Sequence, residues 1–190
     1  MKQTLFILIF CFGLAHYPVA ADTGEQPEVT ADELEHQIHQ QINRVRQDYG
    51  LPPLDSDELL IAIARKHSSD MARYRFFSHI NLQGEGPAER ANNLGWNKKK
   101  QLSSNTWVTG PGENIFMDHL YDEVVTTTEN GVMVKQEYDW KTQEEIAQST
   151  VQGWMNSPPH RKNILSPQYD QEGIGVAISG DEVYITEDLF

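Results

Sequence analysis

The hydrophobic pattern near the start of the chain predicts two helices. A Thr-Ala-Asp-Glu capping box at residues 30–33 precedes an apolar stripe with spacings of three and four, which ends at Gly50. Residues 55–58 can cap a second helix, which we expect to end near Arg75. The two stripes consist of Leu34, Ile38, Ile42, Val45 and Tyr49, and of Leu60, Ile63, Ala64, His67 and Met71.

The second half of the chain predicts one more helix and two strand pairs. A second capping box at residues 142–145 begins a helical stripe that Ser157-Pro-Pro159 ends. Asn130-Gly131 is a strong hairpin signal, because both residue types tolerate positive φ. The expected pairs are residues 123–128 with 132–138, and residues 173–178 with 182–186.

Residues 76–112 lose this periodicity and are rich in Gly, Asn, Ser and Pro. They predict a long loop, which we expect Trp96 and Trp107 to anchor to the core. Lys98–Lys100 is expected to be a solvated loop tip without a function of its own.

Composition and charge narrow the class of protein. The chain has 190 residues, of which 38% are hydrophobic and 23% charged, as expected for one ordinary globular domain. Lys and Arg total 15 against 28 Asp and Glu, which gives a formal charge of -13. Because phosphate binding depends on positive charge, nucleic acid is not expected as a partner.

The N-terminus predicts export. The apolar run at residues 5–14 follows Lys2 and is too short to span a bilayer, but it suits a signal peptide. Val19-Ala20-Ala21 offers small residues at the two positions that a signal peptidase reads, which predicts cleavage after Ala21, with Ala20 as the alternative. The expected organisation is therefore a signal peptide (1–21), a flexible lead (22–29) and one domain (30–190). The mature protein is then secreted or periplasmic, has no stable membrane span, and lacks Cys11, the only cysteine.

Three residues with metal-binding side chains follow predicted elements or helix breakers: His79, Glu113 and His160. Two imidazoles and a carboxylate suit zinc or a similar divalent ion and leave one coordination position for water. The spacing alone also agrees with histidines that are hydrogen-bonded in turns. A further alternative uses Ser157, His160 and Glu113 as nucleophile, base and orienting group, although no Gly-x-Ser-x-Gly turn is present.

The other histidines predict structural roles. His67 falls on the apolar stripe of the second helix and is expected to be a hydrogen-bonded core residue. His36 and His39 lie one turn apart on the first helix and could chelate a metal, but their polar neighbours favour a solvated face. His119 beside Asp118 is ambiguous.

Several motifs, taken in order, resemble one known family, the CAP superfamily of cysteine-rich secretory, antigen 5 and pathogenesis-related proteins. More narrowly, the chain from about residue 34 to 190 resembles the cysteine-free bacterial branch of SCP-like extracellular proteins. The motifs are Asn43-Arg-Val-Arg46, Gly50-Leu-Pro-Pro-Leu54, Ala64-Arg-Lys-His-Ser-Ser-Asp-Met-Ala72, Phe76-Phe-Ser-His79, Gly112-Glu-Asn-Ile115, Trp154-Met-Asn-Ser-Pro-Pro-His-Arg-Lys-Asn-Ile-Leu165 and Gly173-Ile-Gly-Val176.

The resemblance implies an α+β fold, a three-layer α-β-α sandwich with a cleft that contains two histidines and acidic partners. His79, Glu113 and His160 match three members of the family's four-residue cluster. Ser157 stands where the eukaryotic pattern has Glu, so metal binding is expected to be weak or pH-sensitive. Residues 121–140 exceed the usual bacterial linker, and we interpret the hairpin there as an insertion that either overhangs the cleft or is inert.

Fold alone does not give function. The leading hypothesis is an exported binding module, non-catalytic or weakly active, that holds a weakly bound divalent metal such as zinc or a small polar ligand. Its cleft would be built by His79, Glu113, Ser157 and His160. Asn114, Arg161 and Asn163 would support that cleft. The alternatives are a metal-assisted extracellular hydrolase and a structural protein that contacts cell-envelope components.

Overall fold

The computed structural model describes residues 25–190, so the predicted signal peptide lies outside the described residues. Residues 25–30 precede the first helix without helix or strand. The helices are α1 (Ala31–Asp48), α2 (Glu58–Tyr74), α3 (Pro87–Asn93), α4 (Gln143–Asn156) and α5 (Pro158–Ile164). The strands are β1 (Asp55–Ser56), β2 (Lys100–Ser103), β3 (Thr106–Val108), β4 (Gly112–His119), β5 (Tyr121–Glu129), β6 (Val132–Trp140), β7 (Gln171–Ser179) and β8 (Glu182–Leu189).

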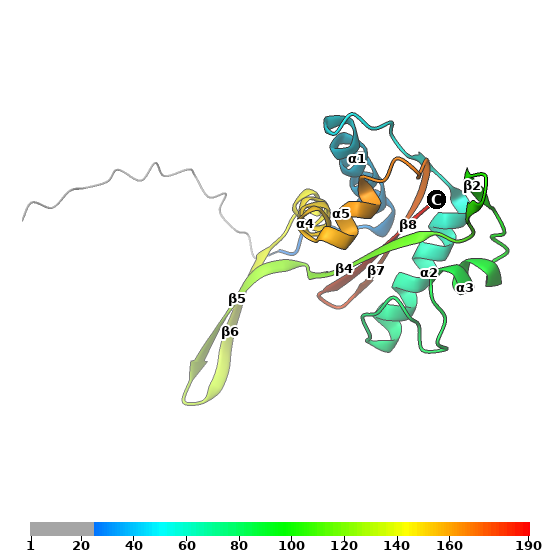
Figure 1. Cartoon of the computed structure of the whole chain (residues 1–190). Helices are drawn as coiled ribbons and strands as arrows, with labels where there is room; N and C mark the ends of the chain where they lie inside the picture. Colours follow the sequence, from blue (N-terminus) through cyan, green and yellow to red (C-terminus); the bar gives the residue numbers. More distant parts are fainter. Residues whose placement is uncertain (1–24) are drawn as a thin grey trace, which may run out of the picture.

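A central sheet separates two layers of helices, as the resemblance implied (Figure 1). Its strand order is β1-β7-β8-β4, in which β1 runs parallel to β7 and the other neighbours are antiparallel. Helices α1, α4 and α5 cover one face and α2 and α3 the other. The fold is therefore α+β, with β1 and β4 as the two edge strands of this sheet.

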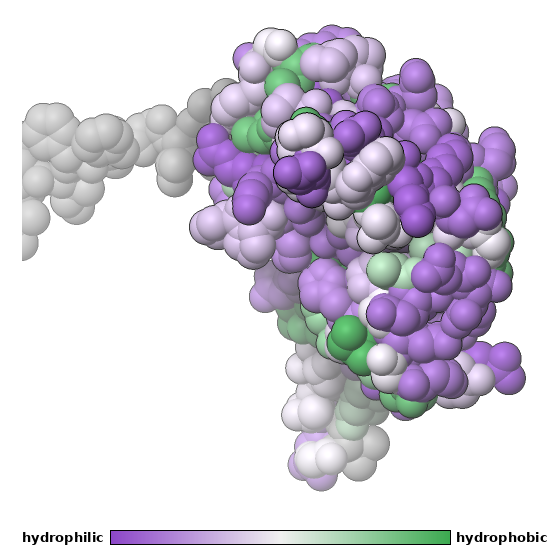
Figure 2. All heavy atoms as spheres, turned by 45° about the vertical axis from the view of Figure 1, so that its right-hand side comes forward, coloured by the Kyte–Doolittle hydropathy of each residue, from purple (hydrophilic) through white to green (hydrophobic). Residues whose placement is uncertain are grey.

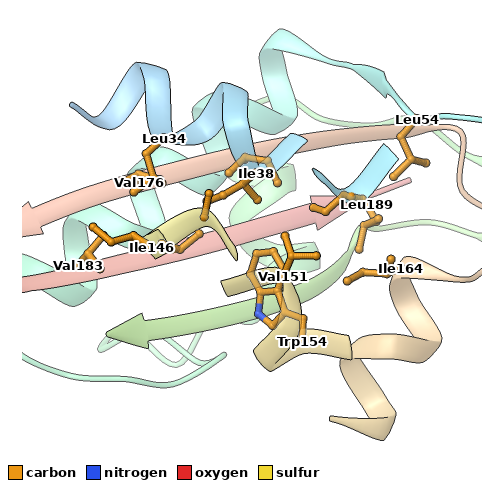
Figure 3. Packing of buried hydrophobic residues seen from close by; sticks show 14 of the residues in the cluster. Leu34, Ile38, Leu54, Ile146, Val151, Trp154, Ile164, Val176, Val183 and Leu189 are labelled. Carbon is orange, nitrogen blue, oxygen red and sulfur yellow. The ribbon is translucent and has the colours of Figure 1, made fainter. Parts of the chain in front are cut away.

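The main hydrophobic core lies between the sheet and the layer of α1 and α4 (Figure 3). Leu34 and Ile38 of α1 face the sheet, and Trp154 of α4 is fully buried. The Trp154 indole N–H donates to the carbonyl of Ile115 at 3.1 Å, which satisfies the polar atom of this buried ring. The apolar stripes predicted from the sequence thus form the core, except for Tyr49 at the end of the first stripe, which is exposed.

Two glycines of β7 let α2 lie unusually close to the sheet. A Cβ on Gly173 would lie 2.2 Å from the backbone of α2, and one on Gly175 would lie 2.0 Å from the nitrogen of Arg65. Any side chain at either position would push the helix away. The Gly-x-Gly pair therefore sets the spacing between this helix and the sheet.

The predicted insertion is a separate two-stranded hairpin of β5 and β6, and its turn residues Asn130 and Gly131 both have positive φ, as expected. The hairpin projects from the body at the C-terminal end of β4 (Figure 1). Glu113 lies near the opposite end of that eight-residue strand, about 20 Å away at 3.3 Å per residue. The alternative in which the hairpin overhangs the cleft is therefore wrong.

Two predicted local interactions need correction. Thr30 makes no side-chain cap at the start of α1; its backbone N–H donates to Gln143 of α4 instead, and Glu33 accepts from Gln37. Trp96 is buried as expected, but Trp107 is 53% exposed and anchors nothing.

The expected loop at residues 76–112 contains α3, β2 and β3, and β4 begins at its end. Ser157 ends α4 as predicted, but it also begins the short helix α5, because proline is favoured in a first helical turn. Asp57 caps the N-terminus of α2. The helix ends at Arg75, where the backbone adopts a left-handed conformation and the chain changes direction. The capping box of Thr142 and Glu145 is confirmed.

The surface agrees with the strongly acidic composition. Figure 2 shows a face on which hydrophilic residues predominate, with hydrophobic residues scattered among them. None of the helices described in residues 25–190 combines the length and the hydrophobicity of a transmembrane segment.

Candidate functional site

The candidate site lies at the β4 edge of the sheet. Glu113 of β4 is paired with Asp188 of β8, which is in turn paired with Gly173 of β7, so these three residues point to the α2 face. The next residue, Asn114, points to the opposite face, toward α5. An edge strand thus presents consecutive polar side chains to both helical layers.

Two donors hold the buried carboxyl group of Glu113. The Nδ1 atom of His79 lies 2.7 Å from its Oε1, and a guanidinium nitrogen of Arg90 donates to its Oε2. Arg90 belongs to α3 and also donates to the carbonyl of His79 at 2.7 Å. One arginine therefore fixes both the carboxylate and the loop that carries the histidine.

This arrangement leaves one nitrogen of His79 free for chemistry. Because both oxygens of Glu113 accept hydrogen bonds, Nδ1 of His79 carries a hydrogen, and in the neutral imidazole Nε2 keeps its lone pair. The His79 side chain is 47% exposed, whereas that of Glu113 is 1% exposed. The buried carboxylate orients an imidazole whose reactive atom is accessible to solvent.

His160 approaches the same place from α5. Its ring centroid lies 6.3 Å from that of His79, with 53° between the planes. Partial burial and the neighbouring His79 lower the pKa of His160. The two histidines and Glu113, which lie far apart in the sequence, are thus brought together.

The predicted supporting residues fall into two groups. Asn114 donates to the carbonyl of His160 at 3.3 Å, and Asn163 donates to the carbonyl of Glu113 at 3.2 Å and to the amide oxygen of Asn114 at 2.8 Å. These amides connect β4 to α5 and set the spacing between the two histidines. Arg161 instead donates to the Tyr49 hydroxyl at 3.0 Å.

Ser157 lies at the junction of α4 and α5, where its carbonyl accepts from the backbone of Arg161. Within residues 25–190 its hydroxyl makes no hydrogen bond to His160 or Glu113. The alternative with Ser157 as a nucleophile therefore lacks the contact to a base that it requires.

Sequence reasoning missed Arg90 and Asp188. Asp188 is fully buried, and neither of its carboxyl oxygens has a hydrogen-bond partner among the described residues. Burial, and next the negative charge of Glu113, raise the pKa of Asp188 well above its usual value. Asp188 therefore favours its neutral form more than an exposed aspartate does, and Arg90 forms its ion pair with Glu113. No sequence motif indicated Arg90. The available argument was chemical, because a buried glutamate carboxylate requires a cation beside it.

The donor atoms do not fit a tightly held metal ion. Both oxygens of Glu113 are already bonded, and Arg90 places a positive charge beside them. Two imidazoles remain, fewer than the three protein ligands of ordinary zinc sites. Across residues 25–190 no three His, Cys, Asp or Glu side chains are arranged to hold a metal ion.

The remaining histidines differ in environment. His67 is a buried core residue as predicted, with Nε2 3.0 Å from the carbonyl of Ser78. His36 is exposed, as expected. His39 contradicts the prediction of a solvated face: α1 packs against β7, and Nδ1 of His39 lies 2.5 Å from the buried carboxyl group of Glu172. His119 packs against the ring of Tyr121 at 5.3 Å.

Comparisons with known proteins agree with this architecture. The protein YkwD of Bacillus subtilis, described as uncharacterized, is 31% identical over 146 residues, which are 77% of this chain and 43% of that protein. The chain thus spans less than half the length of this relative. An outer surface protein of Borrelia burgdorferi superimposes with a TM-score of 0.57 at 14% identity, over 87% of this chain and 98% of that one.

An extracellular protein of Bacillus anthracis that contains an SCP domain superimposes with a TM-score of 0.54 at 22% identity, over 91% of this chain and 45% of that one. At such identities the two structures show the fold alone. The sequence model of the Cysteine-rich secretory protein family (CAP) matches residues 39–189 of this chain. The chain therefore belongs to the CAP family.

Proposed function

We propose that this protein is an extracytoplasmic binding module that holds a small polar ligand between His79 and His160. The observation that carries the proposal is the meeting of two imidazoles, 6.3 Å apart between centroids, above a buried carboxylate. A group of hydrogen-bonding size fits between two rings at this separation.

The charges favour a neutral or anionic ligand over a cation. Arg90 balances the charge of Glu113, so no net negative charge faces the two histidines. Protonation of either imidazole adds positive charge. A divalent ion would meet only two imidazole ligands and is expected to bind weakly.

The location outside the cytoplasm rests on two supports. The apolar run at residues 5–14 has the length of a signal-peptide hydrophobic region. The two structural neighbours are described as an outer surface protein and an extracellular protein.

The hydrolase alternative is less well supported. The orienting hydrogen bond of Glu113 occupies the carboxylate that would have to act as metal ligand or general base. The structural alternative predicts that His79 contributes to stability, which its exposed side chain does not favour.

Nitrogen-15 NMR of the histidine side chains tests the proposal directly. The labelled protein is titrated with a panel of small carboxylates, polyols and amides, and separately with zinc chloride. We expect at least one organic solute to shift the His79 and His160 signals together, and zinc to bind weakly.

The matched variants are His160→Ala, which removes one side of the site, and His36→Ala, which removes an exposed histidine on α1. Binding should be lost in the first variant and retained in the second. Solutes that bind without shifting either His79 or His160, or a panel with no binder at all, would count against the proposed cleft.

A further inference from the structure

A second histidine with a buried carboxylate behind it lies on the other side of the molecule. Nδ1 of His39 is 2.5 Å from Oε1 of Glu172, and its Nε2 is 3.5 Å from the hydroxyl oxygen of Ser56. All three residues line a cavity of about 260 Å³ between α1 and the β1 edge of the sheet. A hydroxyl, an imidazole and a carboxylate thus follow one another in contact.

The hydrogen bonds of Asn43 fix the tautomer of His39. The Asn43 amide oxygen accepts from the backbone of Leu54 at 2.7 Å, and its nitrogen donates to the carbonyl of the same residue at 3.0 Å, so the orientation of this amide is determined. The amide nitrogen also lies 3.3 Å from Nε2 of His39. Because that nitrogen is a donor, Nε2 keeps its lone pair, and Nδ1 carries the hydrogen toward Glu172.

Solvent exposure decreases from Ser56 to His39 to Glu172, as nucleophilic catalysis requires. Ser56 lies on the exposed strand β1, the His39 side chain is 24% exposed, and that of Glu172 is 1% exposed. The serine is accessible to a substrate, the imidazole separates it from the core, and the carboxyl group is shielded from water.

The strand pairing leaves a backbone donor at the serine. The N–H groups of Asp55 and Asp57 donate to carbonyls of residues 170 and 172, each at 2.9 Å. Backbone N–H groups alternate in direction along a strand, so that of Ser56 points away from β7, toward the free edge of β1. It is available to a negatively charged oxygen that forms at the serine.

We propose that Ser56, His39 and Glu172 form a hydrolytic site for small esters, with Ser56 as nucleophile, His39 as general base and Glu172 as positioning residue. The Ser56 oxygen bonds to the ester carbonyl carbon while Nε2 of His39 takes the hydroxyl proton. The oxyanion then collapses, the C–O bond to the leaving group breaks, and the alcohol leaves with the proton from His39. Water attacks the acyl-serine by the same route and releases the acid.

The distance of 3.5 Å between Ser56 and His39 is long for an engaged pair. Nε2 is shared with Asn43, and such contacts shorten when a substrate is bound. Burial lowers the pKa of His39, so the imidazole is the neutral base at neutral pH.

Glu172 faces several charged groups. It contacts Glu187 of β8 and His39 of α1, and Arg46 of α1 contributes positive charge; Asp55 of β1 acts on His39. Burial raises the pKa of Glu172 to about 8. When Glu172 carries its proton on the oxygen that faces Glu187, its other oxygen can still accept the Nδ1 hydrogen of His39, so the His39 tautomer is the same. The full negative charge of Glu172 develops only at higher pH. Acylation should therefore become faster from pH 6 to pH 9.

The lining of the cavity limits the substrate. Four carboxyl groups, from Asp32, Glu35, Glu58 and Glu172, face it with one arginine, Arg65, and with the aliphatic side chains of Ile61 and Ile174. The acidic lining disfavours anionic substrates. The volume is below the roughly 300–1,000 Å³ of sites for drug-sized ligands. The expected substrates are short-chain esters that are neutral or positively charged.

The probe for the test is p-nitrophenyl acetate, used with the full chain at pH 8. We expect release of p-nitrophenolate and an acetyl group on Ser56, located by peptide mass mapping. Because a general base contributes about 10²–10⁴-fold, Ser56→Ala and His39→Gln should each lower the acylation rate at least about tenfold. Glu172→Gln should lower the rate and flatten its rise with pH, a readout that a merely structural role would not move.

His119→Gln is the control, because His119 is an exposed histidine that does not line this cavity. Its rate should equal that of the wild type. An unmodified Ser56, or a rate that Ser56→Ala leaves unchanged, would overturn the proposal. Ser56 is exposed, so its replacement tests chemistry rather than folding.

Discussion

The two carboxylate-histidine pairs of this protein are alike in geometry and different in charge. In both, a histidine places Nδ1 against a buried glutamate, at 2.7 Å for His79 and Glu113 and at 2.5 Å for His39 and Glu172. Arg90 bonds directly to Glu113, whereas Glu172 contacts a second carboxyl group, that of Glu187. The same motif is thus built once on an ion pair and once on a pair of acids.

The acid pair requires a shared proton. Neither Oε2 of Glu172 nor Oε1 of Glu187 receives a hydrogen from another residue in the described part of the chain. Burial raises the pKa of both carboxyl groups, and the negative charge of Glu172 raises that of Glu187 further, which favours one proton shared by the pair over two negative charges. Arg46 then balances the one remaining negative charge, with four hydrogen bonds from its guanidinium to backbone carbonyls.

The largest expected difference follows from replacing each glutamate by glutamine. Glu113→Gln leaves Arg90 buried without its counter-ion, which should cost about 3–5 kcal/mol of unfolding free energy. Glu172→Gln keeps an acceptor for His39 and a donor for Glu187, so at pH 7 it should cost less than about 1 kcal/mol. Urea unfolding of both variants measures the contrast, and equal losses would show that the two centres do not differ in charge.

The dependence of stability on pH sharpens the comparison. Burial raises the pKa of Glu172 from 4.5 to about 8 and that of Glu187 well above its usual value. The folded protein therefore holds protons that the unfolded chain releases above about pH 4.5, so stability should fall as the pH rises toward 8. Glu187→Gln removes one such group and should reduce the slope near pH 7 by about 1.4 kcal/mol per pH unit.

Unfolding free energies at pH 5, 7 and 8.5 test this point for the wild type and for Glu187→Gln. A wild-type protein that becomes more stable over this range would contradict the shared proton.

A smaller difference is expected for the histidines themselves. His39→Ala leaves an oxygen of the buried Glu172 without a donor and should cost about 1–3 kcal/mol. His79 is half exposed, and water can replace its hydrogen bond, so His79→Ala should cost less than about 1 kcal/mol. Thermal unfolding of both variants measures the two losses of stability. A larger loss for His79→Ala than for His39→Ala would support the structural alternative for the cleft.

The sequence predicted those elements of the fold that have a local pattern and missed those that do not. The stripes of α1, α2 and α4 and the Asn130-Gly131 turn were legible, because apolar spacing and turn chemistry are local. Strand β4 was missed, since its first residues are polar although they are buried. Seven-residue α3 was hidden in a segment rich in glycine and proline.

The sites show the same limit. His79, Glu113 and His160 were found because they lie in motifs that resemble a family. Arg90 and Asp188 have no such motif, and only the register of β4 with β8 brings Asp188 beside Glu113. His39 looked solvated because its sequence neighbours are polar, and nothing local indicates that Glu172 would lie against it.

The smallest expected effect concerns the hairpin. Its strands pair with each other and project from the body, so replacing residues 123–138 by a short glycine-containing turn removes little packing (Figure 1). The melting temperature should change by less than about 4 °C, the shift that 1 kcal/mol produces in a domain of this size. A larger fall would show that the hairpin supports the fold.

The most direct test of the account is the tautomer of each histidine, measured by long-range proton–nitrogen NMR at pH 7.5. If a carboxyl group orients each imidazole, both His79 and His39 carry hydrogen on Nδ1 and a bare Nε2, whereas the exposed His119, whose ring has no carboxyl partner among the described residues, does not show this fixed state. Hydrogen on Nε2 of either His79 or His39 would contradict the account.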